Sequence, residues 1–226
     1  MNKTKIKFAV LFSGGKDSCL ALHKAIKEGY EIKYLLAIIP DNFDSFMFHK
    51  PYLSLLEKQA EMLNIDLVVF KSEGVENEEV NDLKKLIESV KGKVDGIVVG
   101  GIASNYQGSR IKKICDELGL DVYAPLWDYS PEGIWNELLK NNFKVILTKL
   151  SCEGIPKEFL GKIIDERIFL KLKKLSERYK FRSDFEGGEA ETTVLYMPEF
   201  NREIKIKFDI KSEGEYRHFL ENLKVK

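Results

Sequence analysis

Short apolar runs alternate with amphipathic stretches through the first half of the chain, and this rhythm restricts the fold more than any other feature of the sequence. Five brief apolar runs read as buried strands: Lys5–Phe12, Glu31–Ile39, Ile65–Phe70, Val94–Val99 and Asp121–Ala124. Four segments between them read as helices: Ser18–Glu28, Tyr52–Leu63, Glu78–Val90 and Gln107–Leu118. This alternation predicts a Rossmann-like α/β fold, in which helices cover both faces of a five-stranded parallel sheet.

The alternation stops after Pro125. Two helices and three strands are expected beyond it, at Pro131–Leu139, Ile163–Tyr179, Val145–Thr148, Thr192–Met197 and Glu203–Phe208. This mixture predicts a smaller α+β domain at the C-terminal end. We place the boundary near Trp127, which gives a nucleotide-binding type of domain over residues 1–127 and a mixed domain over residues 128–226.

Composition and charge exclude several classes of protein. Lys and Arg number 36, as do Asp and Glu, so no overall positive field attracts nucleic acid. The longest apolar runs, such as Tyr34–Ile39, are far shorter than the ~20 residues that span a bilayer. Cys19, Cys115 and Cys152 lie far apart and form no CxxC pair, which argues against a disulfide framework. We therefore expect a cytoplasmic protein that needs neither a membrane nor direct contact with nucleic acid.

A glycine-containing loop joins the first predicted strand to the first predicted helix. It consists of Ser13, Gly14, Gly15, Lys16, Asp17 and Ser18. Paired glycines let backbone N–H groups approach an anion, and the helix N-terminus behind them adds a positive dipole end. Lys16 can balance phosphate charge, and Asp17 suits a Mg²⁺ ion bound to the phosphates. The loop matches neither the P-loop nor the dinucleotide-binding pattern, so it predicts a different kind of phosphate site.

A second segment of interest, Gly100–Arg110, follows the fourth predicted strand. Open α/β sheets bind ligands at the carboxyl ends of neighbouring strands, so this segment is expected at the ligand site. A tyrosine could stack on a ring, a glutamine could read an amide edge and an arginine could clamp phosphate or carboxylate. A plain helix cap with a surface arginine is the alternative. We assign Gly100 and Ser104 to nucleotide binding, and Tyr106, Gln107 and Arg110 to substrate binding.

Two features lie beyond the first domain's last strand. Trp127 is either a packing residue between domains or a platform for substrate. Further on, Glu186, Gly187, Gly188 and Glu189 place two carboxylates on a tight turn, which we expect to be exposed. Such a turn can hold Mg²⁺, an ammonium ion or a catalytic proton, and a polar hairpin is the alternative. We assign Trp127 and the four turn residues to substrate binding.

The motifs together resemble one family. SGGKDS resembles the PP-loop of the N-type ATP pyrophosphatases. The order of SGGKDS, G-x-I-x-S-x-Y-Q-x-x-R, PLW, Cys152–Ile155 before Leu160–Gly161, and EGGE-x-E-T resembles the diphthine–ammonia ligase family, from about Phe8 to Phe200. Three residues depart from the family's usual pattern: Gly101, Phe185 and Ala190. The chain is similar to the compact archaeal form of the family.

The resemblance implies a Rossmann-like, HUP-type sheet and an ATP-dependent amide ligase. Such an enzyme adenylates the diphthine carboxylate on translation elongation factor 2 and amidates it with ammonium, releasing AMP and pyrophosphate. It implies ATP and Mg²⁺ as cofactors, and we expect Lys16, Asp17, Glu186 and Glu189 to be catalytic. The sequence leaves open whether two copies of the chain form a homodimer. The alternatives are another PP-loop ligase acting on a small carboxylate or tRNA, and a non-catalytic ATP-binding module.

Overall fold

The computed structural model describes residues 5–40, 52–72, 79–101 and 105–226. The chain divides into two compact units. The first comprises Met1–Ser13 and Asp17–Asp128, and the second comprises Gly14–Lys16 and Tyr129–Lys226. The loop after the first strand is therefore shared, because its outer residues belong to the first unit and its middle residues to the second.

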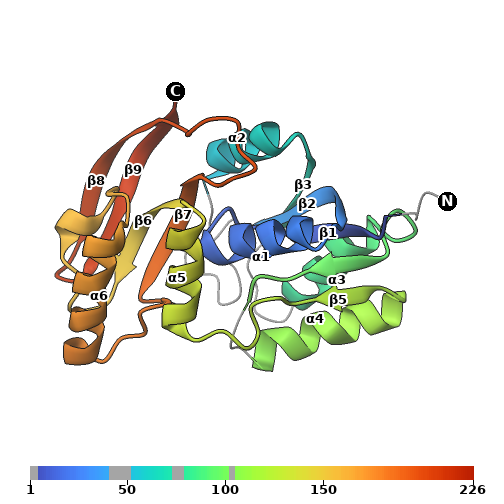
Figure 1. Cartoon of the computed structure of the whole chain (residues 1–226), viewed down its shortest axis with the longest axis horizontal. Coiled ribbons are helices and arrows are strands. Elements are labelled where there is room, and N and C mark those ends of the chain that lie inside the picture. The colour runs from blue at the N-terminus through green and yellow to red at the C-terminus, as the bar shows by residue number, and fades with distance from the viewer. Residues whose placement is uncertain (1–4, 41–51, 73–78, 102–104) are drawn as a thin grey trace. The chain divides into compact units, whose positions relative to one another are not determined.

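The first unit is built on a five-stranded parallel sheet in the order β3-β2-β1-β4-β5 (Figure 1). Its strands are β1 (Lys7–Leu11), β2 (Glu31–Pro40), β3 (Asp66–Ser72), β4 (Gly96–Val98) and β5 (Asp121–Tyr123). The order confirms the predicted Rossmann-like α/β fold. Since the chain leaves β1 toward β2 on one side and returns as β4 on the other, the carboxyl ends of β1 and β4 mark the switch point at which open sheets bind ligands.

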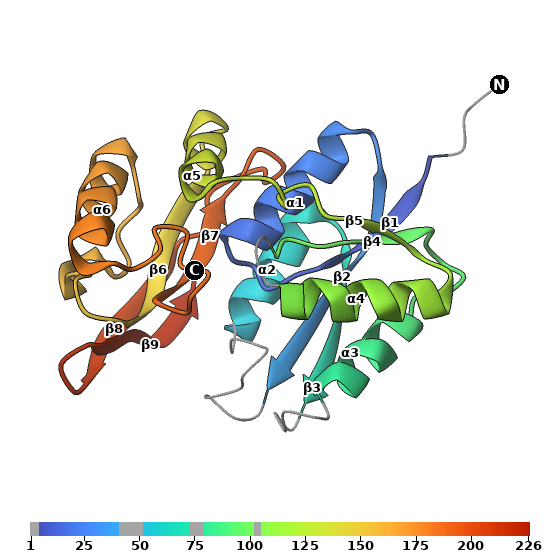
Figure 2. The same cartoon turned by 90° about the horizontal axis from the view of Figure 1, so that it is seen from below.

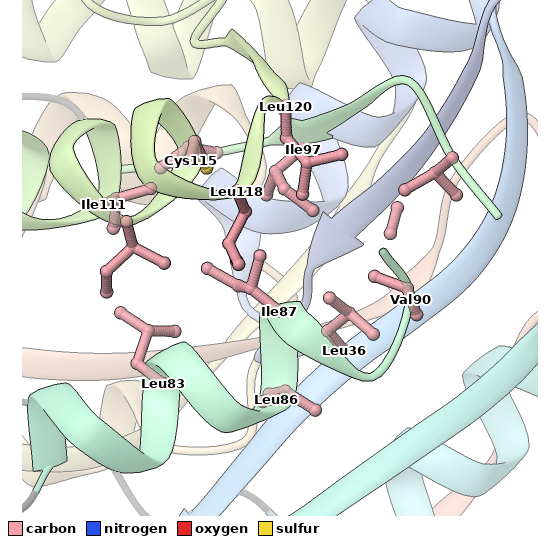
Figure 3. Close-up of a cluster of buried hydrophobic side chains, with 14 of the residues drawn as sticks. Leu36, Leu83, Leu86, Ile87, Val90, Ile97, Ile111, Cys115, Leu118 and Leu120 are labelled. Carbon is pink, nitrogen blue, oxygen red and sulfur yellow. The ribbon is translucent and has the colours of Figure 1, made fainter. Parts of the chain in front are cut away.

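Helices lie on both faces of this sheet. They are α1 (Lys16–Lys27), α2 (Leu53–Leu63), α3 (Glu79–Glu88) and α4 (Asn105–Leu118). α3 and α4 lie side by side on one face, and α1 and α2 lie across the sheet from them (Figure 2). Figure 3 shows the core beneath α3 and α4, where Leu83 and Ile87 of α3 and Ile111 and Cys115 of α4 point toward the strands. Cys115 is fully buried in this core, and its burial raises the pKa of its thiol to about 11.

The second unit holds a four-stranded antiparallel sheet in the order β7-β6-β9-β8. Its elements are α5 (Pro131–Lys140), β6 (Lys144–Ser151), a 3₁₀ turn η1 (Lys157–Phe159), α6 (Glu166–Tyr179), β7 (Ala190–Tyr196), β8 (Ile206–Glu213) and β9 (Arg217–Val225). α5 and α6 lie on the same face of this sheet (Figure 1, Figure 2). The predicted smaller α+β part of the chain is therefore present.

Three predictions for this unit need correction. The strand expected at Glu203–Phe208 lies later, at Ile206–Glu213, and β9 was not predicted. Both strands lack a buried apolar run, because no residue of β8 and only Leu220 of β9 is buried. The helix expected from Ile163 begins at Glu166, since the Asp165 side chain caps it by accepting a hydrogen bond from the Ile168 amide at 2.8 Å.

An aromatic cluster forms the core beside the carboxylate turn. Trp135 of α5 is fully buried, and its indole N–H donates to the Ser183 carbonyl at 2.7 Å. Its ring lies 5.5 Å from that of Phe169 and 6.1 Å from that of Phe185, measured between centroids. The cluster thus fixes the chain immediately before the turn. Among the described residues, no helix is both long and apolar enough to cross a membrane.

Candidate active site

The outer residues of the glycine loop belong to the first unit. The hydroxyls of Ser13 and Ser18 lie 3.3 Å apart, with Ser13 exposed and Ser18 buried. Asp17 is half-buried in the first turn of α1. Two hydroxyls and a helix N-terminus thus lie at the carboxyl end of β1, and a helix N-terminus favours an anion.

Gly100 lies against this loop at the carboxyl end of β4. A Cβ atom at Gly100 would come within 2.7 Å of both the Asp17 carbonyl carbon and the Ser18 amide nitrogen. Only glycine therefore lets β4 approach the start of α1 so closely. The structure gives Gly100 a steric role in placing the loop, which its predicted part in nucleotide binding did not specify.

The middle residues of the loop pack on β7 in the second unit. Gly14, at φ +72°, has its carbonyl oxygen bound by the Val194 amide at 3.0 Å and by the Thr193 hydroxyl at 3.3 Å. The Lys16 amide donates to the Thr192 hydroxyl at 3.2 Å. Sequence reasoning included Thr192 in the EGGE-x-E-T motif without a role for it, and it missed Thr193. The structure shows that this part of β7 holds the loop.

Lys16 is buried beside the chain that leads into the carboxylate turn. Its side chain is 3% exposed, and its ammonium nitrogen lies 5.8 Å from the centroid of the Phe185 ring. This is a cation–π distance. The Lys16 charge also contributes to lowering the pKa of Asp184, so the two charges are close enough to interact.

The turn from Glu186 to Glu189 is less exposed than its sequence predicts. One oxygen of Glu189, Oε1, accepts a hydrogen bond from the Arg182 amide at 2.9 Å. The other, Oε2, is buried and has no hydrogen-bond partner among the described residues. A Cβ atom at Gly187 would lie 2.6 Å from Glu189 Oε1, and Gly188 adopts φ +83°. The expectation of an exposed turn was wrong for Glu189, because the glycines let its side chain fold back.

An ion pair that sequence reasoning missed precedes the turn. Arg182 donates to both carboxylate oxygens of Asp184, from Nε at 2.9 Å and from Nη2 at 2.6 Å. The Glu186 amide also lies 3.3 Å from Asp184 Oδ1. Burial would raise the pKa of Asp184, but the bonds from Arg182 and Glu186, together with nearby positive charge, bring that pKa below its ordinary value. No sequence motif marks these residues, since their pairing depends on burial.

Cys152 lies near the same carboxylate. The amide of its neighbour Ser151 donates to the Glu189 carbonyl at 2.8 Å. Burial and then the charge of Glu189 raise the pKa of the Cys152 thiol to about 11. The thiol is therefore neutral near pH 7 and a poor nucleophile.

The remaining predicted site residues lie on or beside α4. Trp127 is 44% exposed and its ring covers Gly108, where a Cβ atom would come within 2.7 Å of two ring carbons. Arg110 is half-buried on α4. The backbones of Tyr106 and Gln107 form the first turn of α4, but their side chains, like the whole of Ser104, lie outside the described residues.

Both halves of the chain match the sequence models of known protein families. Residues 6–122 match the sequence model of the diphthamide synthase N-terminal domain, and residues 130–224 match that of the diphthamide synthase C-terminal domain. The two matches follow one another in the order that these names give.

Individual relatives agree with the family models. A diphthine–ammonia ligase from Mus musculus is 32% identical over 222 residues, which are 89% of this chain and 83% of that protein. The Homo sapiens protein of the same name is 32% identical over 88% of this chain and 82% of its own length. The Danio rerio protein is 33% identical over 87% of this chain and 84% of its own length. This chain therefore belongs to the diphthamide synthase family.

Proposed function

We propose that this chain is an ATP-dependent amide ligase, which joins ammonium to the diphthine carboxylate of translation elongation factor 2 and releases AMP and pyrophosphate. Family membership and relatives named diphthine–ammonia ligases support the ligase class. One structural observation carries the proposal. Thr192 and Val194, which follow the carboxylate turn directly, hold Lys16 and Gly14 of the glycine loop, so both features belong to one compact unit.

The glycine loop fits a nucleotide's phosphates. Gly14 has a positive φ that other residues adopt rarely, and Gly100 leaves no room for a side chain beside the loop. Ser13 and Ser18 offer hydroxyl donors, while Lys16 and the α1 N-terminus favour negative charge. ATP bound there supplies a good leaving group for activation of a carboxylate, and a Mg²⁺ ion on its phosphates would take Asp17 as a ligand.

Glu189 suits the handling of ammonium. Its Oε1 is held by the Arg182 amide, whereas its buried Oε2 has no donor among the described residues. A buried carboxylate oxygen without a donor is costly, and a small cation with N–H groups satisfies it. The same oxygen can then take a proton from ammonium, which gives the free amine needed for attack. Such general-base catalysis contributes about 10²–10⁴ in rate. Glu186 is the second candidate for this role.

The two parts of the chain divide the work in this proposal. Residues 1–127 bind ATP, with Gly14–Lys16 held by the second unit, and residues 128–226 bind the protein substrate. In this proposal four residues of the first part also contact the substrate: Tyr106, Gln107, Arg110 and Trp127. The protein acts in the cytoplasm, where its substrate takes part in translation. Thiol chemistry of the kind used in tRNA thiolation is disfavoured, because the pKa values of Cys115 and Cys152 are raised to about 11.

The products of ATP cleavage test the reaction type. Purified protein is incubated with ATP and Mg²⁺, with and without ammonium and elongation factor 2 that carries diphthine. We expect AMP and pyrophosphate, formed in step with the amide and dependent on both additions. ADP and orthophosphate as the first products would contradict the proposal.

Substitution of Glu189 tests the ammonium role. We expect Glu189→Gln to leave ATP affinity within about threefold, because Glu189 is not assigned to the phosphates, and to slow amide formation by about 10²-fold or more. Calorimetry measures ATP binding and mass spectrometry of the elongation factor measures the amide. Glu177→Gln, at an exposed position of α6, is the matched control. Loss of ATP binding in Glu189→Gln would instead move this residue to the nucleotide site, and full amidation would make the turn structural.

A further inference from the structure

Arg182 and Asp184 together hold both ends of the carboxylate turn. The Arg182 backbone amide binds Glu189 Oε1 at 2.9 Å, and the Asp184 carboxylate accepts from the Glu186 amide at 3.3 Å. The two residues are joined by the bidentate contact between the guanidinium and the carboxylate. The Asp184 side chain thus connects the backbone of Glu186 to Arg182, and the backbone amide of Arg182 holds the fixed oxygen of Glu189. We call this arrangement the Arg182–Asp184 clamp.

The clamp is built on a buried charge. The side chain of Asp184 is 0% exposed, whereas that of Arg182 is 47% exposed. Burial by itself disfavours the ionised carboxylate, but the bonds from Arg182 and the Glu186 amide outweigh that penalty, because they bring the pKa of Asp184 below its ordinary value. An apolar side chain would fill a buried position without this penalty. Such a side chain could accept neither bond, so the carboxylate is what fixes the turn's first amide in place.

The backbone between Asp184 and Glu186 is also strained. Phe185 adopts φ +62°, a left-handed conformation that a bulky residue rarely takes. Its ring is fixed by Trp135 at 6.1 Å and by Phe181 at 6.4 Å, measured between centroids. Such strain persists only where surrounding contacts impose it, and it is concentrated at functional sites. Here the left-handed residue reverses the chain so that the Glu186 amide faces the Asp184 carboxylate.

We propose that Asp184, acting through Arg182 and the Glu186 amide, is a positioning residue that sets the place of the Glu189 and Glu186 carboxylates for the amide-forming step. The step itself rests on the proposed function. The placement of Glu189 does not, and it can be measured without any reaction. The clamp acts by geometry, because both carboxylate oxygens of Asp184 are bound by Arg182.

The thiol of Cys152 reports where Glu189 lies, since the charge of Glu189 helps to raise the pKa of that thiol. The rate of Cys152 alkylation by iodoacetamide is followed against pH by peptide mass spectrometry, which separates it from the buried Cys19 and Cys115. Glu189→Gln should lower the pKa of Cys152, because it removes the negative charge. The shift in this variant is the reference for the full effect of Glu189. We expect Asp184→Ala to shift that pKa in the same direction by at least half as much. A profile identical to that of the wild type would overturn the proposal.

Activity provides the second readout. We expect Asp184→Ala to lower kcat for amide formation by about 10²-fold, as misplacement of a catalytic group by about 1 Å does. ATP affinity should stay within threefold, and more AMP should form per amide because the activated carboxylate is then lost to water. Asp184→Asn keeps the size and one acceptor oxygen, so it should retain most of the activity and of the Cys152 response.

Glu203→Ala is the matched control, since Glu203 is an ion-paired carboxylate of the same unit that bonds Lys144 and Lys205. It should leave the AMP-to-amide ratio and the Cys152 profile unchanged. An Asp184→Ala protein that lost activity only in proportion to its folded fraction, by near-ultraviolet circular dichroism of the Trp135 cluster, would overturn the proposal. If the wild type forms no amide at all, the proposed function is wrong, and the Cys152 profile still decides the clamp.

Discussion

Single glycines set the position of functional groups in this protein by leaving room for them. At Gly100 the missing side chain makes space for the backbone of Asp17 and Ser18, and at Gly187 it makes space for the carboxylate of Glu189. The sequence indicates both glycines, because each stands in a motif. It does not indicate what each one touches, since that depends on segments far away along the chain or folded back on it.

Neighbouring glycines allow a sharp test of this reading. We expect Gly100→Ala to weaken ATP binding by tenfold or more and to destabilise the fold by about 1–3 kcal/mol, because its Cβ would meet backbone at 2.7 Å. Gly101→Ala is the control, since no described atom lies within 4 Å of a Cβ there. Calorimetric titration and urea unfolding of both variants measure these effects. Equal behaviour of the two variants would contradict the steric role of Gly100.

Asp184 predicts how stability depends on pH. Its pKa in the folded protein lies below the ordinary value of 3.8, so the stabilisation is complete above that value and is lost as the pH falls through the folded pKa. We expect the wild type to lose more of its free energy of unfolding than Asp184→Asn between roughly pH 5 and pH 2. Urea unfolding at each pH measures the difference. Parallel curves for the two proteins would refute this expectation.

Helices and strands differ in how well their sequences reveal them. β1 and β4 are short apolar runs buried in the sheet, and α3 carries an apolar stripe, so each was predicted close to its observed bounds. β8 and β9 pair with each other, and their side chains are mostly exposed in β8 and mostly half-buried in β9. Ile206, Phe208 and Ile210 of β8 alternate with polar residues, but none of them is buried, so the signal marks a strand without fixing its bounds. In β9 the apolar residues Phe219 and Leu220 are adjacent, so no alternation runs through the whole of that strand.

The start of α6 depends on one side chain. Asp165→Ala removes the acceptor for the Ile168 amide and should lower the free energy of unfolding by about 1 kcal/mol. Asp165→Asn keeps an acceptor oxygen and should stay within a few tenths of a kcal/mol of the wild type. Thermal and urea unfolding of the three proteins compare them. A loss of similar size in both variants would show that the charge of Asp165, rather than its cap, stabilises the helix.

For the whole molecule, the order of the motifs was enough to predict the family, to which both halves of the chain belong. The segments that make up the second unit were not predictable in the same way. Three residues of the glycine loop, Gly14–Lys16, belong to it through their contacts with Thr192, Thr193 and Val194. From the sequence alone, a loop is assigned to the domain that precedes and follows it along the chain. In the structure, it belongs to the unit whose residues it contacts.

The contacts between this shared loop and β7 predict which backbone amides exchange more slowly when ATP binds. Hydrogen exchange of the Lys16 and Val194 amides should slow when a non-hydrolysable ATP analogue binds, because both amides hold the loop against β7. The amide of Leu220 in β9 should be unaffected and serves as the reference. Exchange measured by mass spectrometry with and without the analogue tests this. Slower exchange at Ser18 with no change at Val194 would show that the loop responds independently of β7.

The contacts between the glycine loop and β7 also restrict which parts of two related proteins can be exchanged. A chimaera joined at Asp128 and Tyr129 takes its loop from one parent and the strand that supports the loop from the other. Substitutions at positions 14–16 and 192–194 must therefore be compatible across the junction, although the two segments are more than 170 residues apart in sequence. Chimaeras of distant members that are joined between Asp128 and Tyr129 should fail to fold more often than chimaeras in which positions 14–16 and 192–194 come from the same parent.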